Sequence, residues 1–430
     1  MSILLSRTHV RAVALSAFVA ASPMQAAANE GGTVPEHPTF TRDVLPILQE
    51  SCQVCHRPDM FTPMSLLTYE DVRPWARAIR QRVAERVMPP WFADRTVGRY
   101  RDDPSLSEAQ IATIARWVDQ GAPRGNPADA PPTVAWPAVD TWYHGEEPDL
   151  VVTSPSVVVP PNSTETYPEP EMSTGLTEDR YIKWIQVMPG ESRVVHHVLV
   201  YAVRGAEDDA ADDGAPRGVR ELLANRARGD FVGDHFEDGY ARLLRKDDRI
   251  RLQLHYLPDD ERSFTDQTRV GIKFYPAGYE PEYVVRTRAV SNRADLVIPP
   301  GAPNVRSDAY FTLPEATRII SFQPHMHYRG RAMTLEAIRP GSATPELLSD
   351  VDRFAWDWQP TYVYEKPLTL PAGTVMHVTA YHDNSAANRV NPDPEAAVGW
   401  GQRTIDEMNI GWLDYFHISE DEYAELQAEE

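Results

Sequence analysis

The chain contains two cysteines in 430 residues, and both lie in the run Cys52-Gln53-Val54-Cys55-His56. This pattern is a c-type haem attachment motif, in which each thiol bonds to the haem and the histidine ligates the iron. We therefore expect a haem c held by Cys52, Cys55 and His56. A structural zinc site would need further cysteines, and a thioredoxin-like motif lacks the trailing histidine. Because no thiol remains, the fold has no disulfide to stabilise it, and any second metal needs nitrogen, oxygen or thioether ligands.

Residues 1–28 resemble a signal peptide for export. Arg7 and Arg11 precede an apolar stretch at 12–21, and small residues follow at 26–28. The apolar stretch is too short to span a bilayer. We therefore expect a periplasmic or secreted protein with no membrane insertion after the signal is removed. The net charge of −21 argues against nucleic acid or an anionic membrane as a partner.

Residues 36–125 are predicted to form a small all-α domain. A stripe of apolar residues recurs at helical spacing after the attachment motif: Val72, Trp75, Ile79 and Val83. Further on, Ser107 and Gln110 have the spacing of a capping box, and Gly121 is placed to end the helix. A helix, an attachment loop, a helix and a closing helix, in this order, resemble a small cytochrome c.

Met88 is the predicted sixth ligand of the haem iron. It lies in Val87-Met88-Pro89-Pro90-Trp91, where the prolines favour a stiff, extended loop. A thioether ligand raises the reduction potential of a haem. Met60 and Met64 are alternatives, although their closeness to the attachment motif makes the opposite haem face hard to reach. A buried core methionine is the alternative interpretation of Met88.

The hydrophobic pattern changes after residues 126–148, which are rich in proline and alanine and are predicted to be a linker. Beyond the linker the period is two: Ile250, Leu252 and Leu254 alternate with polar residues. Clusters of turn residues separate such stretches. We therefore expect two antiparallel β-sandwich or jelly-roll domains, at residues 149–290 and 291–420.

Five histidines lie in three of the predicted strands. His325 and His327 are two residues apart, so a strand would direct both rings to one face. His196 and His197 are adjacent, and they can share one ion only if the strand bulges there. Together with His255 they would make a site of three nitrogen ligands, which suits zinc or copper. A methionine as third ligand beside His325 and His327 would favour copper.

These histidines lie in three short motifs, and a fourth motif that contains a methionine follows them along the chain. In order, the four are Val195-His196-His197-Val198-Leu199, Gln253-Leu254-His255-Tyr256, His325-Met326-His327-Tyr328-Arg329-Gly330 and Asp406-Glu407-Met408. Over residues 149–418 the chain resembles the copper type II, ascorbate-dependent monooxygenase family. The resemblance implies two β-sandwiches with one copper ion each, facing each other across solvent.

The resemblance also assigns the ligands of the two copper ions. His196, His197 and His255, here called the three-histidine set, would hold a copper that relays electrons. His325, His327 and Met408, here called the His–Met set, would hold the copper that binds oxygen and hydroxylates the substrate. For Met408 taken alone, a buried core thioether is the alternative interpretation.

The chain departs from the peptidylglycine-hydroxylating branch at the three positions that would grip a peptide carboxylate. They are Gln323, Ile410 and Trp412. A carboxylate clamp is therefore missing, and a more apolar or aromatic substrate is expected. His377 and His382 are either supporting residues of a metal site or structural histidines, and the latter is favoured. His144, His235 and His417 follow no pattern.

The combined interpretation is an exported monooxygenase that depends on haem and two copper ions. It would hydroxylate a small organic substrate with O₂, and its electrons would come from a periplasmic donor through the fused haem. Three alternatives remain open. The chain is a non-catalytic electron-transfer or copper-binding protein, a copper oxidoreductase acting on a small nitrogen or sulfur species, or a haem domain fused to a β-sandwich adhesion module.

Overall fold

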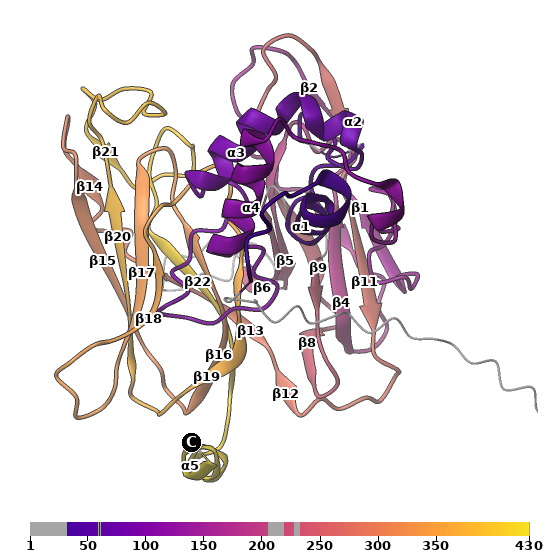
Figure 1. Cartoon of the computed structure of the whole chain (residues 1–430). Helices are drawn as coiled ribbons and strands as arrows, with labels where there is room; N and C mark the ends of the chain where they lie inside the picture. Colours follow the sequence, from indigo (N-terminus) through magenta and orange to yellow (C-terminus); the bar gives the residue numbers. More distant parts are fainter. Residues whose placement is uncertain (1–31, 59, 61, 205–218, 228–232, 430) are drawn as a thin grey trace, which may run out of the picture.

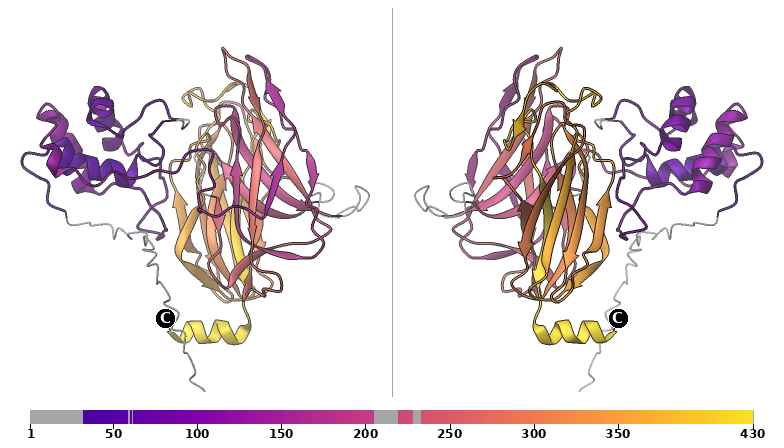
Figure 2. Two further views of the ribbon diagram at one scale, coloured as in Figure 1. Left: turned by 90° about the vertical axis from the view of Figure 1, so that its right-hand side faces the viewer. Right: turned by 90° about the vertical axis from the view of Figure 1, so that its left-hand side faces the viewer.

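The computed structural model describes residues 32–58, 60, 62–204, 219–227 and 233–429. A helical part is followed by two β-sandwiches that pack against each other (Figure 1). The helical part projects from one side of the sandwiches, and the C-terminal helix lies at one end of them (Figure 2). Among the described residues, no helix is long and apolar enough to cross a membrane. The signal peptide expected at residues 1–28 lies outside the described residues.

The helical part consists of short helices around one small core. Its elements, with the separate C-terminal helix last, are η1 (Phe40–Val44), α1 (Leu45–Ser51), α2 (Tyr69–Val72), η2 (Arg73–Trp75), α3 (Ala76–Ala84), α4 (Glu108–Asp119), η3 (Pro127–Asp129) and α5 (Glu420–Glu429). Leu48, Ile114 and Trp117 are completely buried between these helices. The described regular elements of residues 36–125 are helices, while the predicted all-α cytochrome c-like domain stays a prediction.

Local signals in the sequence set the ends of α4. The side chain of Ser107 accepts a hydrogen bond from the Gln110 N–H, and the Gln110 side chain accepts one from the Ser107 N–H, so the predicted capping box is confirmed. Gly121 follows the helix with φ of +89°, a conformation that favours glycine. The expected apolar stripe is wrong at Trp75, which is 44% exposed. Trp75 is the last residue of the tighter turn η2, whose different residue spacing rotates its side chain off the face that α3 buries.

The first β-sandwich consists of two main sheets and a small ribbon. One sheet has the order β1-β11-β4-β8-β12, with β7 paired to β4; the other has the order β3-β9-β5-β6, and β2 pairs with β10. The bounds are β1 (Leu150–Thr153), β2 (Val157–Val159), β3 (Glu171–Ser173), β4 (Arg180–Met188), β5 (Val195–Val203), β6 (Val219–Ala227), β7 (Asp234–His235), β8 (Tyr240–Leu244), β9 (Arg249–Tyr256), β10 (Phe264–Asp266), β11 (Arg269–Phe274) and β12 (Tyr283–Val284).

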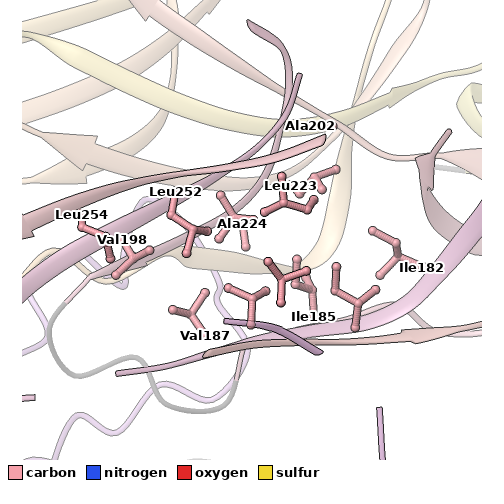
Figure 3. Close-up of a cluster of buried hydrophobic side chains, with 14 of the residues drawn as sticks. Ile182, Ile185, Val187, Val198, Ala202, Leu223, Ala224, Leu252 and Leu254 are labelled. Carbon is pink, nitrogen blue, oxygen red and sulfur yellow. The ribbon is translucent and has the colours of Figure 1, made fainter. Parts of the chain in front are cut away.

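Alternating apolar residues of the facing sheets fill the core of this sandwich. Ile182 and Ile185 of β4 face Leu252 and Leu254 of β9, and all four are completely buried (Figure 3). The alternation of apolar and polar residues along β9 therefore separates a face that packs into the core from a polar face.

The second β-sandwich has the sheet orders β13-β22-β16-β19 and β15-β20-β17-β18, with a small ribbon of β14 and β21. The bounds are β13 (Arg286–Ser291), β14 (Val297–Ile298), β15 (Val305–Thr312), β16 (Thr317–His325), β17 (Gly330–Ile338), β18 (Glu346–Val351), β19 (Tyr362–Leu370), β20 (Val375–His382), β21 (Val398–Gly399) and β22 (Ile410–His417). Because β13 pairs with β22, this sandwich begins a few residues before the position 291 at which the sequence pattern places it.

The stretch that follows Met88 leaves the helical part and runs along the second sandwich. Ala93 forms an isolated bridge with Val351, and Tyr100 forms one with Tyr364. The Tyr100 ring stacks on the Tyr364 ring with centroids 5.3 Å apart. The helical part is therefore attached to the second sandwich by backbone pairing and by aromatic packing.

The predicted linker at residues 126–148 is also fixed to its neighbours. The indole N–H of Trp136 donates to Gln53 of the attachment motif over 3.5 Å, and the guanidinium of Arg57 lies 5.5 Å from the Trp136 ring centroid. Trp142 packs against Trp184 of β4 with ring centroids 6.2 Å apart. The linker thus follows the surface from the attachment motif to the first sandwich.

Candidate metal centre

A bulge in β5 brings the three-histidine set together. The pairing of β5 with β9 shifts register between Val195 and His197, and His197 lies directly opposite His255. The extra residue, His196, is thereby turned toward the same side as its neighbour. The bulge that the adjacent histidines require is confirmed.

The three imidazoles surround one small volume. One ring nitrogen from each histidine lies within 4.8 Å of the others. The Nδ1 atoms of His196 and His197 are 3.3 Å apart, and the His255 ring centroid is 4.9 Å from each of their rings. His196 is 4% exposed and His255 is 1% exposed, whereas His197 is partly exposed. Such a triad of nitrogen donors fits a copper or zinc ion.

Glu165 fixes which nitrogen of His255 faces this volume. The Nε2–H of His255 donates to Glu165 Oε2 over 3.1 Å, so Nδ1 is the nitrogen that can bind a metal. His255 Nδ1 is buried and has no hydrogen-bond partner among the described residues. The Tyr167 ring stacks on the other side of the imidazole, with centroids 4.4 Å apart.

The Glu165 carboxylate is held as an anion. Burial alone would raise the pKa of Glu165, but hydrogen bonds from His255, Thr404 and Tyr167 outweigh burial and lower the pKa to about 2. Thr404 belongs to the loop that carries Met408, so the carboxylate also joins the two sandwiches. Sequence reasoning missed Glu165, which lies in no motif and meets His255 only through the fold.

His325 and His327 lie at the end of β16. His325 is the last residue of the strand and His327 lies just beyond it, with their ring centroids 5.3 Å apart. Met326, between them, points into the core and is completely buried. His325 Nδ1 donates to Gln359 Oε1 over 2.6 Å, and His327 Nδ1 lies 3.2 Å from the Asp406 carbonyl oxygen. Both histidines therefore have Nε2 left for a metal.

A buried carboxylate brings Met408 close to these histidines. Glu407 is completely buried and accepts hydrogen bonds from the backbone N–H groups of His327, Arg329 and Met408. Burial raises the pKa of Glu407 to about 7, although these hydrogen bonds oppose the rise. The Met408 carbonyl accepts from His382 Nε2 over 3.1 Å. The backbone of Met408 is thus held beside His327, as the His–Met set requires.

The two ligand sets lie in direct contact. The rings of His197 and His325 meet edge to face, with centroids 6.0 Å apart. The expectation of two copper sites that face each other across solvent stays a prediction, but these two rings are already in contact. The physical reason is the closed packing of the sandwiches, in which Asn225 of β6 donates to Gln323 of β16 and Thr404 donates to Glu165.

Three histidines of the centre, His197, His325 and His327, are neutral at pH 7. Burial, reinforced by the neighbouring imidazoles, lowers the pKa of His197 well below its ordinary value. Burial lowers the pKa of His325 to about 4 and that of His327 to about 3. A neutral imidazole has a free lone pair, so the protein presents these side chains in the form that binds a metal.

The attachment motif lies in the turn after α1. His56 Nδ1 donates to the Met64 carbonyl over 3.2 Å, which leaves Nε2 as the nitrogen available to iron. Burial raises the pKa of the Cys52 thiol to about 12 and that of the Cys55 thiol to about 11. Met64 packs against the helical core, whereas Met88 follows α3 and is 38% exposed. Met88 thus has its thioether accessible on the helical part, and its role as sixth ligand stays a prediction.

The remaining histidines have partners away from the ligand sets. His377 is held between the carboxylates of Asp308 and Glu336, at 2.7 Å and 2.8 Å, which fits a structural role. His144 stacks on His235 with centroids 5.1 Å apart, and His417 lies 3.0 Å from the Thr317 hydroxyl. His382, which contacts Met408, is the one that lies beside a ligand set.

A small pocket lies between the sandwiches. Gln323, two residues before His325, lines it together with Trp412 and Arg242. The Arg242 guanidinium is 2.8 Å from an Asp414 carboxylate oxygen, and its side chain is 2% exposed. Because the buried cation is already paired, the pocket has no free charge among its described side chains to hold a carboxylate.

Comparison with known proteins gives one family. Residues 288–429 match the family model described as "Copper type II ascorbate-dependent monooxygenase, C-terminal domain". No curated protein matches the chain. The matched residues include His325, His327 and Met408.

Similar solved structures include two viral proteins. The cowpea mosaic virus top component is 10% identical, with a TM-score of 0.35, and the alignment covers 64% of this chain and 93% of that chain. The major capsid protein P2 of bacteriophage PM2 is 11% identical, with a TM-score of 0.28, and the coverage is 61% of this chain and 97% of that chain. Similarity at this level says nothing about what this chain does.

Proposed function

Because residues 288–429 belong to the copper type II ascorbate-dependent monooxygenase family, we propose that this chain is a monooxygenase that hydroxylates a small organic substrate with O₂. The observation that supports this most strongly is the convergence of five histidines from the two sandwiches, of which His196, His255 and His327 are buried. His197 and His325, one from each sandwich, are in ring contact. The arrangement provides two sets of nitrogen donors at one interface.

The described residues fit two copper ions. His255 Nδ1 is buried without a hydrogen-bond partner and faces the other two imidazoles of its set, as a metal ligand would. The second set has two imidazoles whose Nδ1 atoms are committed to Gln359 and to the Asp406 carbonyl. A thioether from Met408 would make this set selective for copper over zinc. When bound, copper supplies the one-electron chemistry by which O₂ is activated.

The protein's own residues orient the ligands and exclude water. Glu165 and Gln359 hold His255 and His325 in one tautomer and one ring orientation. The interface between the sandwiches buries the imidazoles of His196, His255 and His327, which limits the access of water to both ligand sets. The side-chain amide of Gln323 donates to the Gln359 backbone carbonyl and accepts a hydrogen bond from Asn225. Gln323 therefore presents no charge to a substrate. These contacts favour a substrate without a carboxylate, bound beside Ile410 and Trp412.

We also propose a haem c at Cys52, Cys55 and His56, and export to the periplasm or beyond. The hydrogen bond from His56 Nδ1 to the Met64 carbonyl supports the haem, because it directs Nε2 away from the protein backbone. A haem supplies one electron at a time, and a periplasmic donor would reduce it. The attachment motif and the signal-like residues 1–28 support export.

The test is metal analysis followed by isotope labelling. We expect one iron and two copper ions per chain, and incorporation of one oxygen atom from ¹⁸O₂ into product. Copper retention without O₂ consumption would instead indicate an electron-transfer or copper-binding protein. Substrate oxidation without label would indicate a copper oxidoreductase for a nitrogen or sulfur species. A chain that retains no copper would contradict the proposal.

A further inference from the structure

The segment between β18 and β19 joins the helical part to the metal centre. We call residues 353–359 the bridging loop. At its start, the Arg353 guanidinium donates to the carbonyl oxygens of Glu85 and Arg86, over 3.1 Å and 3.3 Å. It also lies 5.4 Å from the centroid of the Phe92 ring. These contacts fall on residues before and after Met88 in the sequence, so the loop begins beside the segment that carries the predicted iron ligand.

The other end of the bridging loop contacts both ligand sets. The Trp356 ring stacks on His196 with centroids 5.1 Å apart and an angle of 14° between the planes. Gln359 accepts the hydrogen bond from His325 Nδ1 and donates to the Trp356 carbonyl over 2.7 Å. Only two residues separate Arg353, which contacts the helical part, from Trp356, whose indole lies on His196. The Tyr328 ring meets the other edge of Trp356, with centroids 4.5 Å apart, and holds it in place.

We propose that the bridging loop conducts electrons from the haem domain to the three-histidine set, and that Trp356 makes the contact with the receiving ligand. The inference rests on the proposed function, because it needs both metals. One electron leaves ferrous haem at Cys52–His56 and reduces one cupric ion at the three-histidine set, so iron becomes ferric and copper becomes cuprous. No bond is made or broken in this step. An external one-electron donor then restores ferrous haem.

The geometry of Trp356 suits this role better than a packing role alone. A nearly parallel stack places the indole π-system over the imidazole π-system, where orbital overlap is large. An aliphatic side chain of similar size would fill the space without such overlap. A phenyl ring would retain part of it. The two substitutions therefore separate conduction from packing.

The experiment measures electron transfer within the full chain, loaded with haem and copper, without O₂ and without substrate. A radiolytic pulse reduces part of the haem, and the haem absorbance then reports its reoxidation while the cupric EPR signal declines. We expect Trp356→Leu to slow this reoxidation about tenfold or more, in the range that second-shell changes at metal ligands produce. Trp356→Phe should retain most of the wild-type rate. Trp400→Leu is the matched control, because it removes an indole from a separate apolar cluster around Ile298. This substitution should leave the rate unchanged.

The copper EPR spectrum and the two reduction potentials are recorded for each variant before the pulse. A Trp356→Leu protein with native spectrum and potentials that transfers at the wild-type rate would overturn the inference. So would equal slowing in Trp356→Leu and Trp356→Phe, because that would indicate a packing role. If the Leu variant loses copper, the Phe variant decides: a rate near wild type supports conduction, and a large loss overturns it. A wild-type chain without a haem spectrum would refute the proposed haem and this inference with it.

Discussion

Glu165 Oε2 lies 3.1 Å from Nε2 of His255, and the other oxygen of the same carboxylate accepts the hydroxyl of Thr404 from the opposite sandwich. One anionic side chain therefore orients a ligand of the three-histidine set and holds the loop that leads to Met408. A carboxylate in this position makes the imidazole a stronger donor to a cation.

Removing the charge of Glu165 should weaken copper binding at the three-histidine set. We expect Glu165→Gln to lower the copper affinity of that set by about 10- to 100-fold, because a neutral amide no longer strengthens the His255 donor. Competition titration with a copper chelator measures the affinity, and EPR reports the ligand field. Glu169→Gln, which alters a carboxylate bonded to Gln253 on the same β9 strand, is the control. Equal affinities for wild type and Glu165→Gln would contradict the assignment.

Met408 should be required for hydroxylation but not for the haem. We expect Met408→Leu to abolish product formation, because the substitution keeps the apolar volume and removes the thioether. The haem spectrum should stay unchanged, since Met408 lies in the second sandwich. Product is measured by mass spectrometry and haem by absorbance. If hydroxylation survives, Met408 is not a ligand. Met326 is a completely buried methionine. The substitution Met326→Leu therefore controls for the loss of a thioether from the core.

Met88 should set the reduction potential of the haem. Removal of a thioether ligand leaves the iron with a weaker or harder ligand, so Met88→Ala is expected to lower the potential. Potentiometric titration followed by absorbance measures the shift. Met64→Leu and Met60→Leu test the two alternatives in the same assay. An unchanged potential in Met88→Ala, together with a fall in one of the others, would move the assignment to that methionine.

The ion cluster around Asp308 should make stability depend on pH. Burial opposes its ionisation, but hydrogen bonds from Arg306, His377 and Thr379 lower the pKa of Asp308 below its ordinary value of 3.8. A carboxyl group with a depressed pKa in the folded state stabilises the fold above pH 3.8, and this contribution is lost as the pH falls through the folded-state pKa. We expect Asp308→Asn to unfold at lower urea concentration than wild type at pH 6, with a smaller difference at pH 3.

Chemical denaturation monitored by tryptophan fluorescence gives these free energies. Asp352→Asn, on a carboxylate that is 69% exposed, is the control for a change in net charge. A difference between wild type and Asp308→Asn that stays constant from pH 6 to pH 3 would show that the Asp308 interactions do not depend on its ionisation.

The proposed metal ligands could be predicted from the sequence, because the pattern that indicates each of them lies within a few neighbouring residues. Two adjacent histidines in a strand require a bulge to share an ion, and the register shift at His196 provides it. The spacing of His325 and His327 likewise follows from the geometry of a strand and its end. The capping box at Ser107 is a signal contained within four residues.

The residues that support the ligands could not be read in this way. Glu165 lies 90 positions from His255, and Gln359 lies 34 positions from His325. Their roles exist only once the sheets have formed and the two sandwiches have closed. The contact of His197 with His325 was likewise inaccessible, since no periodicity encodes how two sandwiches pack. The exposure of Trp75 shows the same limit on a smaller scale, because a single tighter turn changed the buried face.

The pairing of residues near Ala93 and Tyr100 with the second sandwich has a consequence for how the molecule can be divided. The sequence suggests separate domains that follow one another. A fragment that starts after residue 148 would nevertheless lose Ala93 and Tyr100, which are part of the hydrophobic core of the second sandwich. Tyr362 and Tyr364, now 1% and 2% exposed, would meet water along the open flank of β19. Such a fragment would be prone to self-association. In this protein the chain that leads out of the helical part also serves as a wall of the second sandwich.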